Sequence, residues 1–159
     1  REAVELIKAT NPFPSVCGRV CVRPCELSCR RNLTEDSLPV GIDYLKRFVA
    51  DIDLNSESPY TPTLSKPTNK SVGIIGAGPA GLSAAFYLRQ AGHNVDIYEA
   101  EAYAGGWLRY GIPEYRLPNS VLDAEIEQIT KLGVNIHYNQ RLGDNLSFKD
   151  IKRKYDGLL

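Results

Sequence analysis

Residues 71–81 read Ser-Val-Gly-Ile-Ile-Gly-Ala-Gly-Pro-Ala-Gly, and this stretch decides the fold of the larger part of the chain. Its first five residues form a largely apolar run of the kind that makes a buried parallel strand. A G-x-G-x-x-G motif at 76–81 then opens a helix predicted over 79–91, and a second predicted strand at 94–99 ends on Glu99. Glu99 lies 18 residues after Gly81, close to the separation of about 20 seen in dinucleotide-binding βαβ units. The stretch therefore predicts a βαβ unit that binds the ADP half of a dinucleotide.

Each residue type in the motif has a physical task. Gly76 lets the chain turn sharply off the strand, Gly78 leaves room for a pyrophosphate, and Gly81 lets the helix pack closely on the sheet. The N-terminus of the helix offers free N–H groups to phosphates. Glu99 can accept hydrogen bonds from the adenosine ribose, and its negative charge disfavours the 2′-phosphate of NADP at this site.

Strand and helix patterns continue to alternate after this unit. We expect a helix at 122–132, a strand at 134–138, a helix between 147 and 155, and the start of a strand at 156–159. The fold class predicted for residues 71–159 is therefore α/β, a Rossmann-like domain that is truncated before its closing strand. Because the chain opens inside a predicted helix at 2–9, it is expected to be a piece of a longer protein.

The first part of the chain has a different composition. A helix at 42–52 is predicted by apolar residues at helical spacing, so residues 1–54 are expected to form a small helical domain. Residues 55–70 contain Pro59, Pro62 and Pro67 among polar residues, which predicts an extended linker.

This helical part contains four cysteines in a stretch of 13 residues: Cys17, Cys21, Cys25 and Cys29. Such clustering, without a signal peptide, favours metal or cluster ligation in a reducing cytoplasm over a disulfide framework. On one unbroken helix the four sulfurs would span about 18 Å, which is too long for one cluster. Either the segment bends at Gly18 and Pro24 or the thiols serve different clusters. Zinc ligation and purely structural cysteines are the alternatives.

Composition excludes some partners. Lys and Arg together number 19, as do Asp and Glu, so the net charge is zero and gives no sign of nucleic-acid binding. No apolar run approaches the roughly 20 residues that span a membrane.

The residues after Glu99 indicate which dinucleotide is bound. Gly105 and Gly106 complete an E-x5-G-G pattern that is similar to that of flavoproteins related to glutathione reductase. In that group the glycine pair passes near the FAD pyrophosphate. This similarity favours FAD.

Two longer motifs carry a more specific resemblance. Residues 105–118 read Gly-Gly-Trp-Leu-Arg-Tyr-Gly-Ile-Pro-Glu-Tyr-Arg-Leu-Pro, and residues 11–21 read Asn-Pro-Phe-Pro-Ser-Val-Cys-Gly-Arg-Val-Cys. With Pro24-Cys25-Glu26 and Cys29, they resemble the small-subunit family of NADPH-dependent glutamate synthase. The same module occurs in dihydropyrimidine dehydrogenase and in NADH-dependent ferredoxin:NADP oxidoreductase. The resemblance covers essentially the whole chain.

The resemblance implies a set of FAD contacts. The pyrophosphate would be lined by Gly76, Ala77, Gly78, Pro79 and Ala80. Glu99 would hold the ribose and Leu142 would contact the adenine side. The site would continue toward the flavin through Gly106, Trp107 and Arg116, with Ile112 and Pro113 beside the isoalloxazine.

The resemblance also implies ligands for [4Fe–4S] clusters. Cys21 and Cys25 would serve one cluster and Cys29 another, completed by cysteines upstream. Much of the family has a Gln or Glu ligand near the position of Lys46, and an ammonium has no lone pair to donate. Cys17 as the replacement ligand is our hypothesis.

The family passes electrons between NAD(P)H, FAD and iron–sulfur clusters, with NAD(P)H bound by a domain downstream of residue 159. The sequence thus predicts a fragment of an NAD(P)H-dependent flavoprotein oxidoreductase that works with a larger catalytic subunit or domain. No side chain is predicted to act as an acid or base. The alternatives are an NAD-binding dehydrogenase domain and a non-catalytic module that binds zinc and a dinucleotide.

Overall fold

The computed structural model describes residues 1–34 and 37–159. The chain forms two compact units, Arg1–Tyr60 and Thr61–Leu159. The finer division at residues 54 and 70 stays a prediction. In the described ranges, no helix is long and apolar enough to cross a membrane.

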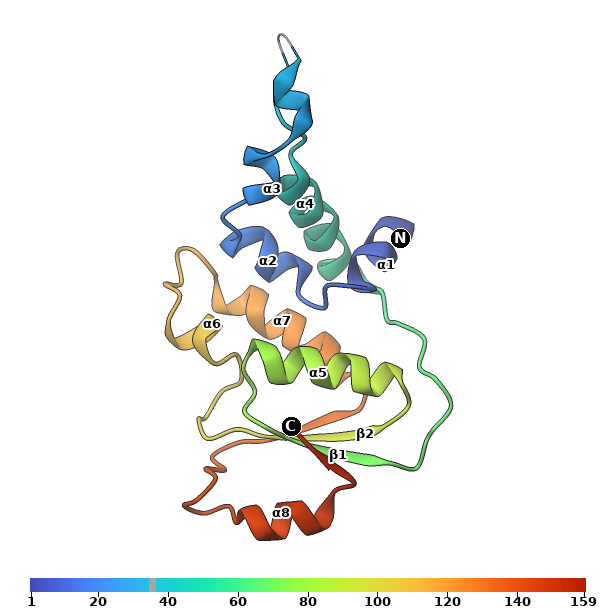
Figure 1. Cartoon of the computed structure of the whole chain (residues 1–159), viewed down its shortest axis with the longest axis vertical. Coiled ribbons are helices and arrows are strands. Elements are labelled where there is room, and N and C mark those ends of the chain that lie inside the picture. The colour runs from blue at the N-terminus through green and yellow to red at the C-terminus, as the bar shows by residue number, and fades with distance from the viewer. Residues whose placement is uncertain (35–36) are drawn as a thin grey trace. The chain divides into compact units, whose positions relative to one another are not determined.

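The Arg1–Tyr60 unit is helical (Figure 1). The bounds of its helices are α1 Glu2–Lys8, α2 Pro14–Val20, α3 Pro24–Leu27, the 3₁₀ helix η1 Arg30–Leu33, and α4 Ile42–Leu54. Proline occupies the first position of both α2 and α3, where its missing N–H costs no helical hydrogen bond.

Helix α2 packs closely against α4. A Cβ added at Gly18 would lie 2.5 Å from the Cβ of Arg47, so only glycine allows this approach. Gly18 therefore allows α2 to pack on α4. It does not bend the chain, although a bend at Gly18 was one of the two options that the sequence left open. The bend lies instead between α2 and α3, where Arg23 adopts a left-handed conformation with φ of 57° just before Pro24.

Polar groups fill much of the contact between these helices. The hydroxyl of Ser15, which is fully buried, donates to Asp51 at 2.6 Å, and Arg19 makes two hydrogen bonds with the same carboxylate at 2.7 and 3.0 Å. Buried Lys8 pairs with Asp53 at 3.1 Å and fastens α1 to the end of α4. The apolar residues whose spacing predicted α4 lie mostly on its exposed side: Ile42, Leu45, Phe48 and Ile52.

The Thr61–Leu159 unit is built on a parallel sheet with strand order β3-β2-β1-β4. The strands are β1 Ser71–Ile75, β2 Asn94–Tyr98, β3 Val134–His137 and β4 Gly157–Leu158. In register, Ile74 lies beside Ile97, which in turn lies beside Ile136. The predicted strand start at residues 156–159 thus forms β4, which pairs with β1.

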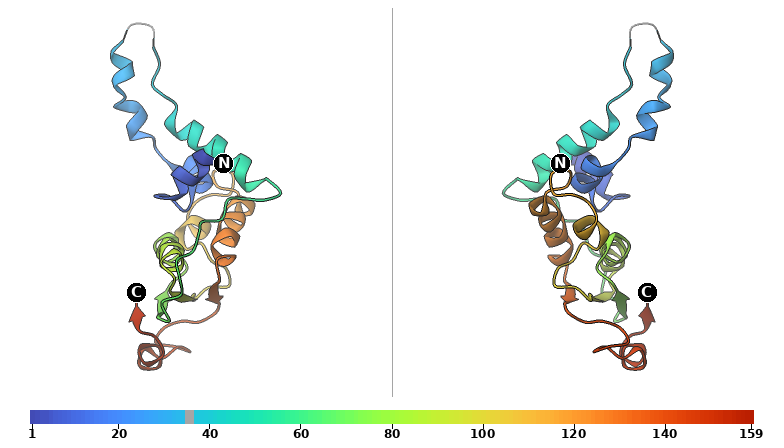
Figure 2. Two further views of the ribbon diagram at one scale, coloured as in Figure 1. Left: turned by 90° about the vertical axis from the view of Figure 1, so that its right-hand side faces the viewer. Right: turned by 90° about the vertical axis from the view of Figure 1, so that its left-hand side faces the viewer.

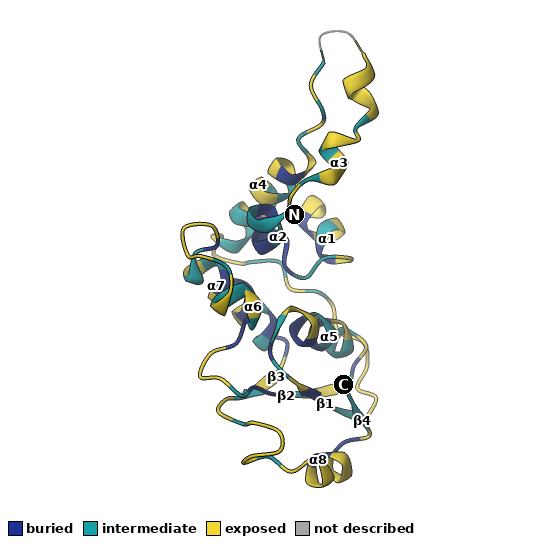
Figure 3. Ribbon diagram, turned by 60° about the vertical axis from the view of Figure 1, so that its left-hand side comes forward, coloured by how far each residue is buried: buried dark blue, intermediate teal, exposed yellow. Residues whose placement is uncertain are grey.

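Helices cover both faces of this sheet. Helices α5 Pro79–Gln90 and α7 Asn119–Thr130 lie on one face and α8 Phe148–Lys154 on the other, with the short α6 Trp107–Tyr110 in the loop after β2 (Figures 1 and 2). Buried residues follow β1 and β2 through the centre of the unit (Figure 3). Its largest fully buried side chains are aliphatic: Ile74, Leu82, Ile97, Leu117, Leu122 and Ile129. The predicted α/β, Rossmann-like class with a helical N-terminal part is confirmed.

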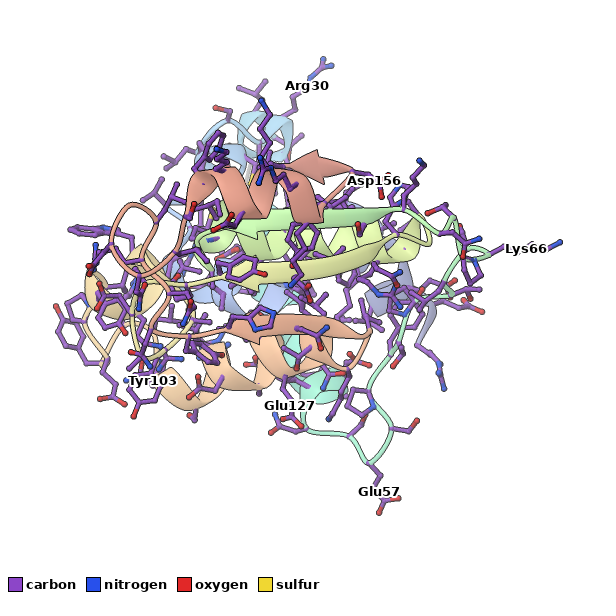
Figure 4. The ribbon with its side chains drawn as sticks, turned by 90° about the horizontal axis from the view of Figure 1, so that it is seen from below. Arg30, Glu57, Lys66, Tyr103, Glu127 and Asp156 are labelled. Carbon is purple, nitrogen blue, oxygen red and sulfur yellow. The ribbon has the colours of Figure 1, made fainter. Side chains whose placement is uncertain are left out.

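Part of the predicted linker is attached to this unit. The amide of Ser65 donates to the carbonyl of Gln90 at 2.8 Å, and that of Thr68 donates to the carbonyl of Gly92 at 3.0 Å. Residues 65–68 therefore lie along the turn between α5 and β2, with the side chain of Lys66 pointing away from the unit (Figure 4).

A polar cluster holds α8 against the other face of the sheet. The hydroxyls of Tyr98 and Tyr155 are 2.7 Å apart, and Tyr155 also donates to Asp96. Nearby, Asp156 accepts a hydrogen bond from the amide of Ser71 at 2.9 Å at the start of β1 (Figure 4). These contacts join the end of the chain to the first two strands.

Candidate functional site

The turn between β1 and α5 has the geometry that its glycines predict. Gly76 has φ of 98°, in the left-handed region that favours glycine, and its amide donates to the carbonyl of Tyr98 at 2.8 Å. A Cβ at Gly81 would overlap the carbonyl oxygen of Gly76. The turn therefore needs glycine at these two positions for the chain itself.

Gly78 is different. Its φ of −78° suits any residue, and an added Cβ would meet only the Cα of Gly106, at 4.0 Å. Nothing within the unit requires glycine there, so the missing side chain leaves open space in front of the N-terminus of α5. Pro79 and Ala80, which begin the helix, are exposed beside this space. The residues present thus fit a pyrophosphate, which the sequence predicts at this point.

Gly105 and Gly106 lie against the same turn. The amide of Gly105 donates to the carbonyl of Ala77 at 2.8 Å, and a Cβ at Gly106 would come within 2.8 Å of the Cα of Gly78. Both glycines have positive φ, 122° and 52°. The structure therefore brings the glycine pair onto the motif that lies about 25 residues earlier in the sequence.

Glu99 joins this group from the end of β2. Its buried carboxylate accepts hydrogen bonds from the amide of Ala77 at 2.6 Å and from that of Glu101 at 2.9 Å. Each carboxylate oxygen keeps a further lone pair. Glu99 therefore fixes the glycine-rich turn and can still accept a hydrogen bond from a ribose hydroxyl.

The remaining predicted contacts lie farther along the chain. Trp107 begins α6 directly after Gly106 and is 76% exposed, with its ring against Gly111. Arg116 is exposed and Ile112 half-buried on the turn that follows α6. Pro113 starts that turn, since its carbonyl accepts from the amides of Arg116 and Leu117.

Leu142 lies in the loop between β3 and α8, where it forms a bridge with Leu146. Its predicted adenine contact stays a prediction.

Arg109 supports the glycine pair in a way that sequence reasoning missed. Its guanidinium donates to the carbonyl of Ala104 at 2.7 Å and pairs with Asp123 of α7. The Cβ of Arg109 also lies 3.2 Å from where a Cβ of Gly105 would stand. The only signal was its place within residues 105–118, because its partner on α7 is distant in sequence.

The four cysteines are free thiols on a bent segment. Cys17 lies in α2, Cys21 directly follows it, Cys25 lies in α3 and Cys29 precedes η1. Cys25 is exposed and the others are partly accessible. Hydrogen bonds from the backbone amides of Val40 and Arg31 lower the pKa of the Cys29 thiol, which favours the thiolate that binds metal.

In the described part of the chain, no group of three or more Cys, His, Asp or Glu side chains is gathered to hold a metal ion. Within the described residues, the bent segment therefore does not form a closed four-thiol site. Accessible thiols do fit iron–sulfur ligation as part of a shared ligand set.

Comparison with protein families agrees with both units. Residues 1–58 match the family described as dihydropyrimidine dehydrogenase domain II, 4Fe-4S cluster. Residues 74–144 match the NAD(P)-binding Rossmann-like domain. Along nearly its whole length the chain is similar to the small-subunit-like family of oxidoreductase subunits. The predicted pairing of an iron–sulfur domain with a dinucleotide-binding domain is thereby confirmed.

Several curated members of the family are similar along nearly the whole chain. The NADPH-Fe(3+) oxidoreductase subunit beta of Geobacter sulfurreducens is 44% identical over 99% of this chain and 23% of its own length. The NAD-dependent dihydropyrimidine dehydrogenase subunit PreT of Escherichia coli is 44% identical, with 99% of this chain and 38% of PreT covered. The beta subunit of the NADP(+)-dependent formate dehydrogenase of Moorella thermoacetica is 40% identical, with 99% and 25% covered. The chain thus spans well under half of these relatives.

A solved structure is similar in fold to part of this chain. It is FprA of Mycobacterium tuberculosis in complex with NADPH. The match covers 58% of this chain and 22% of the FprA chain, with a TM-score of 0.52 and 20% sequence identity. At this identity the match shows the fold alone.

Proposed function

We propose that this chain carries the FAD half-site and part of the iron–sulfur domain of an NAD(P)H-dependent oxidoreductase. The observation that carries the proposal is Gly78. Its backbone conformation allows any residue and its surroundings leave a side chain room, so its glycine serves a group outside the chain. A phosphate at the N-terminus of α5 is the group that this position suits.

The glycine pair supports FAD as the dinucleotide. Gly105 and Gly106 close over the turn in the E-x5-G-G pattern that follows Glu99. A domain that binds only NAD does not need this pair. The family description names NAD(P) for residues 74–144, so an NAD-binding dehydrogenase domain is the second candidate.

The binding roles follow the geometry of the turn. We assign the pyrophosphate to residues 76–81, the ribose to Glu99, and the approach to the flavin to Gly106, Trp107 and Arg116. Ile112 and Pro113 would lie beside the isoalloxazine ring and Leu142 beside the adenine. Trp107 and Arg116 are exposed and thus free to contact a ligand.

The cysteines would supply thiolates to [4Fe–4S] clusters. Cys21 and Cys25 lie on either side of the bend at Arg23, so they can face one cluster, while Cys29 would serve another. Cys17 would complete the ligand set in place of a side chain at position 46.

When bound, FAD exchanges hydride equivalents with nicotinamide nucleotides and single electrons with iron–sulfur clusters. The chain's own part is to hold both groups and shield them, and none of its side chains needs to act as an acid or base. We further propose that NAD(P)H binds a separate domain, that a larger catalytic subunit or domain receives the electrons, and that the protein works in the cytoplasm.

The test is cofactor analysis of the full-length protein purified without oxygen. We expect one FAD for each dinucleotide site, iron and sulfide in place of zinc, and bleaching of the flavin band by NADPH or NADH. Bound NAD without flavin would support the dehydrogenase domain instead. Zinc without iron would support a non-catalytic module.

The ligand role of Cys17 has its own test. Cys17→Ser should abolish the EPR signal of one cluster in the reduced full-length protein, whereas Ser28→Ala, on the same segment, should leave both signals. An unchanged spectrum for Cys17→Ser would remove Cys17 from the ligand set.

A further inference from the structure

The cysteine segment runs antiparallel to α4 in a register that several contacts fix. Ser15 bonds to Asp51 at 2.6 Å, Gly18 lies against Arg47, and Arg23 pairs with Asp43 at 3.4 Å. Residues 17 to 21 are therefore opposite the stretch of α4 that contains Lys46.

Lys46 is held in place within this contact. Its ammonium lies 2.7 Å from Oδ1 of Asp43, a side chain that is only 3% exposed, and Lys46 itself is mostly buried. Asp43 is fixed in turn, since the side chain of Glu26 accepts the hydrogen bond of its amide at 2.8 Å. Beside the bend, Arg23 and Lys46 each carry a positive charge and Asp43 and Glu26 each carry a negative one, so Lys46 supplies one of the two cations of this group.

Both thiols that precede the bend lie on the part of the segment that is opposite Lys46. Asn11 and Lys46 line the same groove, and the thiol of Cys17 lies 3.6 Å from Oδ1 of Asn11. Cys21 is anchored at the bend, where its sulfur accepts from the amide of Arg23 at 3.3 Å. Burial alone would lower the pKa of Lys46, but Asp43 and then the thiols of Cys17 and Cys21 raise it above its usual value.

We propose that Lys46 is a positioning and tuning residue, whose fixed positive charge raises the reduction potential of the cluster that Cys21 helps to bind. This inference rests on the proposed iron–sulfur function and goes beyond it. The ammonium of Lys46 has no lone pair to donate to iron, so its contribution is electrostatic. Adding one electron to a cluster adds one negative charge, which a nearby, partly buried cation stabilises.

The test is an EPR-monitored redox titration of the full-length, cluster-loaded protein, following the signal that Cys21→Ser abolishes. Lys46→Met removes the charge but keeps an unbranched side chain of similar length. At the midpoint potential of the wild type, we expect its ratio of oxidised to reduced cluster to rise about tenfold, which is about 59 mV for a one-electron couple. Lys46→Arg should stay within about twofold of the wild type, because the charge is kept.

Two further variants separate charge from packing. Asp43→Asn removes a negative charge from the same group, so it should shift the midpoint in the opposite direction, toward higher potential. Arg47→Met is the matched control, since Arg47 is adjacent on α4 but pairs with Asp51 at 3.5 Å, away from the bend. In Arg47→Met, the ratio of oxidised to reduced cluster should stay within about twofold of the wild-type ratio.

The outcomes are distinct. Equal midpoints for the wild type and Lys46→Met, equal shifts in Lys46→Met and Lys46→Arg, or shifts of one sign in Lys46→Met and Asp43→Asn would each overturn the inference. Altered g-values in Lys46→Met would also overturn it, by making Lys46 part of the ligand set. If the wild type has no cluster signal, the iron–sulfur function itself fails.

Discussion

Branched aliphatic side chains dominate the interior of the Thr61–Leu159 unit, although Glu99 and Glu125 are also buried there, whereas the smaller apolar interior of the Arg1–Tyr60 unit is joined by ion pairs between its helices. Ile74, Leu82 and Ile97 are almost fully buried in the first, while Lys8 and Asp43 are buried in the second. Several apolar side chains of the helical unit are instead exposed, among them Leu27 at 80% and Leu33 at 82%. The glycine-rich turn is therefore fixed by close packing together with the hydrogen bonds of Glu99, and the cysteine segment mainly by ion pairs and hydrogen bonds to α4.

The largest loss of stability is expected for a substitution at Gly81, where packing leaves no space for a side chain. Gly81→Ala places a Cβ against the carbonyl oxygen of Gly76, so α5 must move off the sheet. We expect the free energy of unfolding of this unit to fall by about 3 kcal/mol, measured by urea denaturation.

Gly157→Ala is the matched control in the same unit. Its Cβ would meet Val72 only at 4.0 Å, so stability should change by about 0.5 kcal/mol or less. Equal effects of the two substitutions would contradict the packing account of the turn.

In the helical unit, the polar side chain expected to contribute most to stability is Asp51. Asp51→Ala removes the partner of Arg19, whose side chain is only 11% exposed, and an acceptor of the buried Ser15. We expect a loss of about 2 kcal/mol in urea unfolding, because a poorly solvated charge is left without its partner.

An exposed ion pair provides the comparison for Asp51. Glu127 pairs with Lys131 at 2.9 Å, and both side chains are more than half exposed. Glu127→Ala should cost about 0.5 kcal/mol or less. An equally small effect of Asp51→Ala would mean that the polar contact between α2 and α4 adds little.

The carboxylate of Asp51 also predicts that the stability of the helical unit depends on pH. Burial alone would raise the pKa of Asp51, but hydrogen bonds from Arg19 and Ser15 lower it below 3.8. A lowered pKa contributes stability above about pH 4 that is lost as the pH falls through the folded-state value. The stability difference between wild type and Asp51→Asn should therefore be full at pH 7 and shrink in acid. A difference that does not change with pH would contradict this account.

A smaller effect is expected for the polar cluster under the sheet. Tyr155→Phe removes the hydroxyl that bonds to Tyr98 and Asp96, so we expect a loss of about 1 kcal/mol. Amide exchange in α8 and β4 should accelerate. Tyr115→Phe, at a side chain that is 91% exposed, should leave exchange unchanged.

The sequence predicted the sheet unit better than the helical one, for a physical reason. A buried parallel strand and a glycine turn leave local signatures, so residues 71–99 could be interpreted without knowledge of distant contacts. The glycine pair at Gly105 and Gly106 was also found, because its spacing from Glu99 is short.

Contacts between distant residues were not predictable in this way. The apolar spacing in α4 predicts a helix, but α4 also carries Asp43 and Asp51, whose partners on the cysteine segment lie about 20 to 36 residues away. Contacts between residues that are distant in sequence also explain two other features. These are the role of Arg109 and the attachment of residues 65–68 to the turn after α5. A single sequence does not reveal which charged residue meets which.

The most direct test of the central claim is the flavin content of Gly78→Val in the full-length protein. A Cβ at position 78 has room within the unit, and the valine side chain would stand where we place the pyrophosphate. We predict normal stability and normal iron content, with FAD occupancy reduced at least tenfold. Full FAD occupancy in a folded Gly78→Val protein would contradict the account.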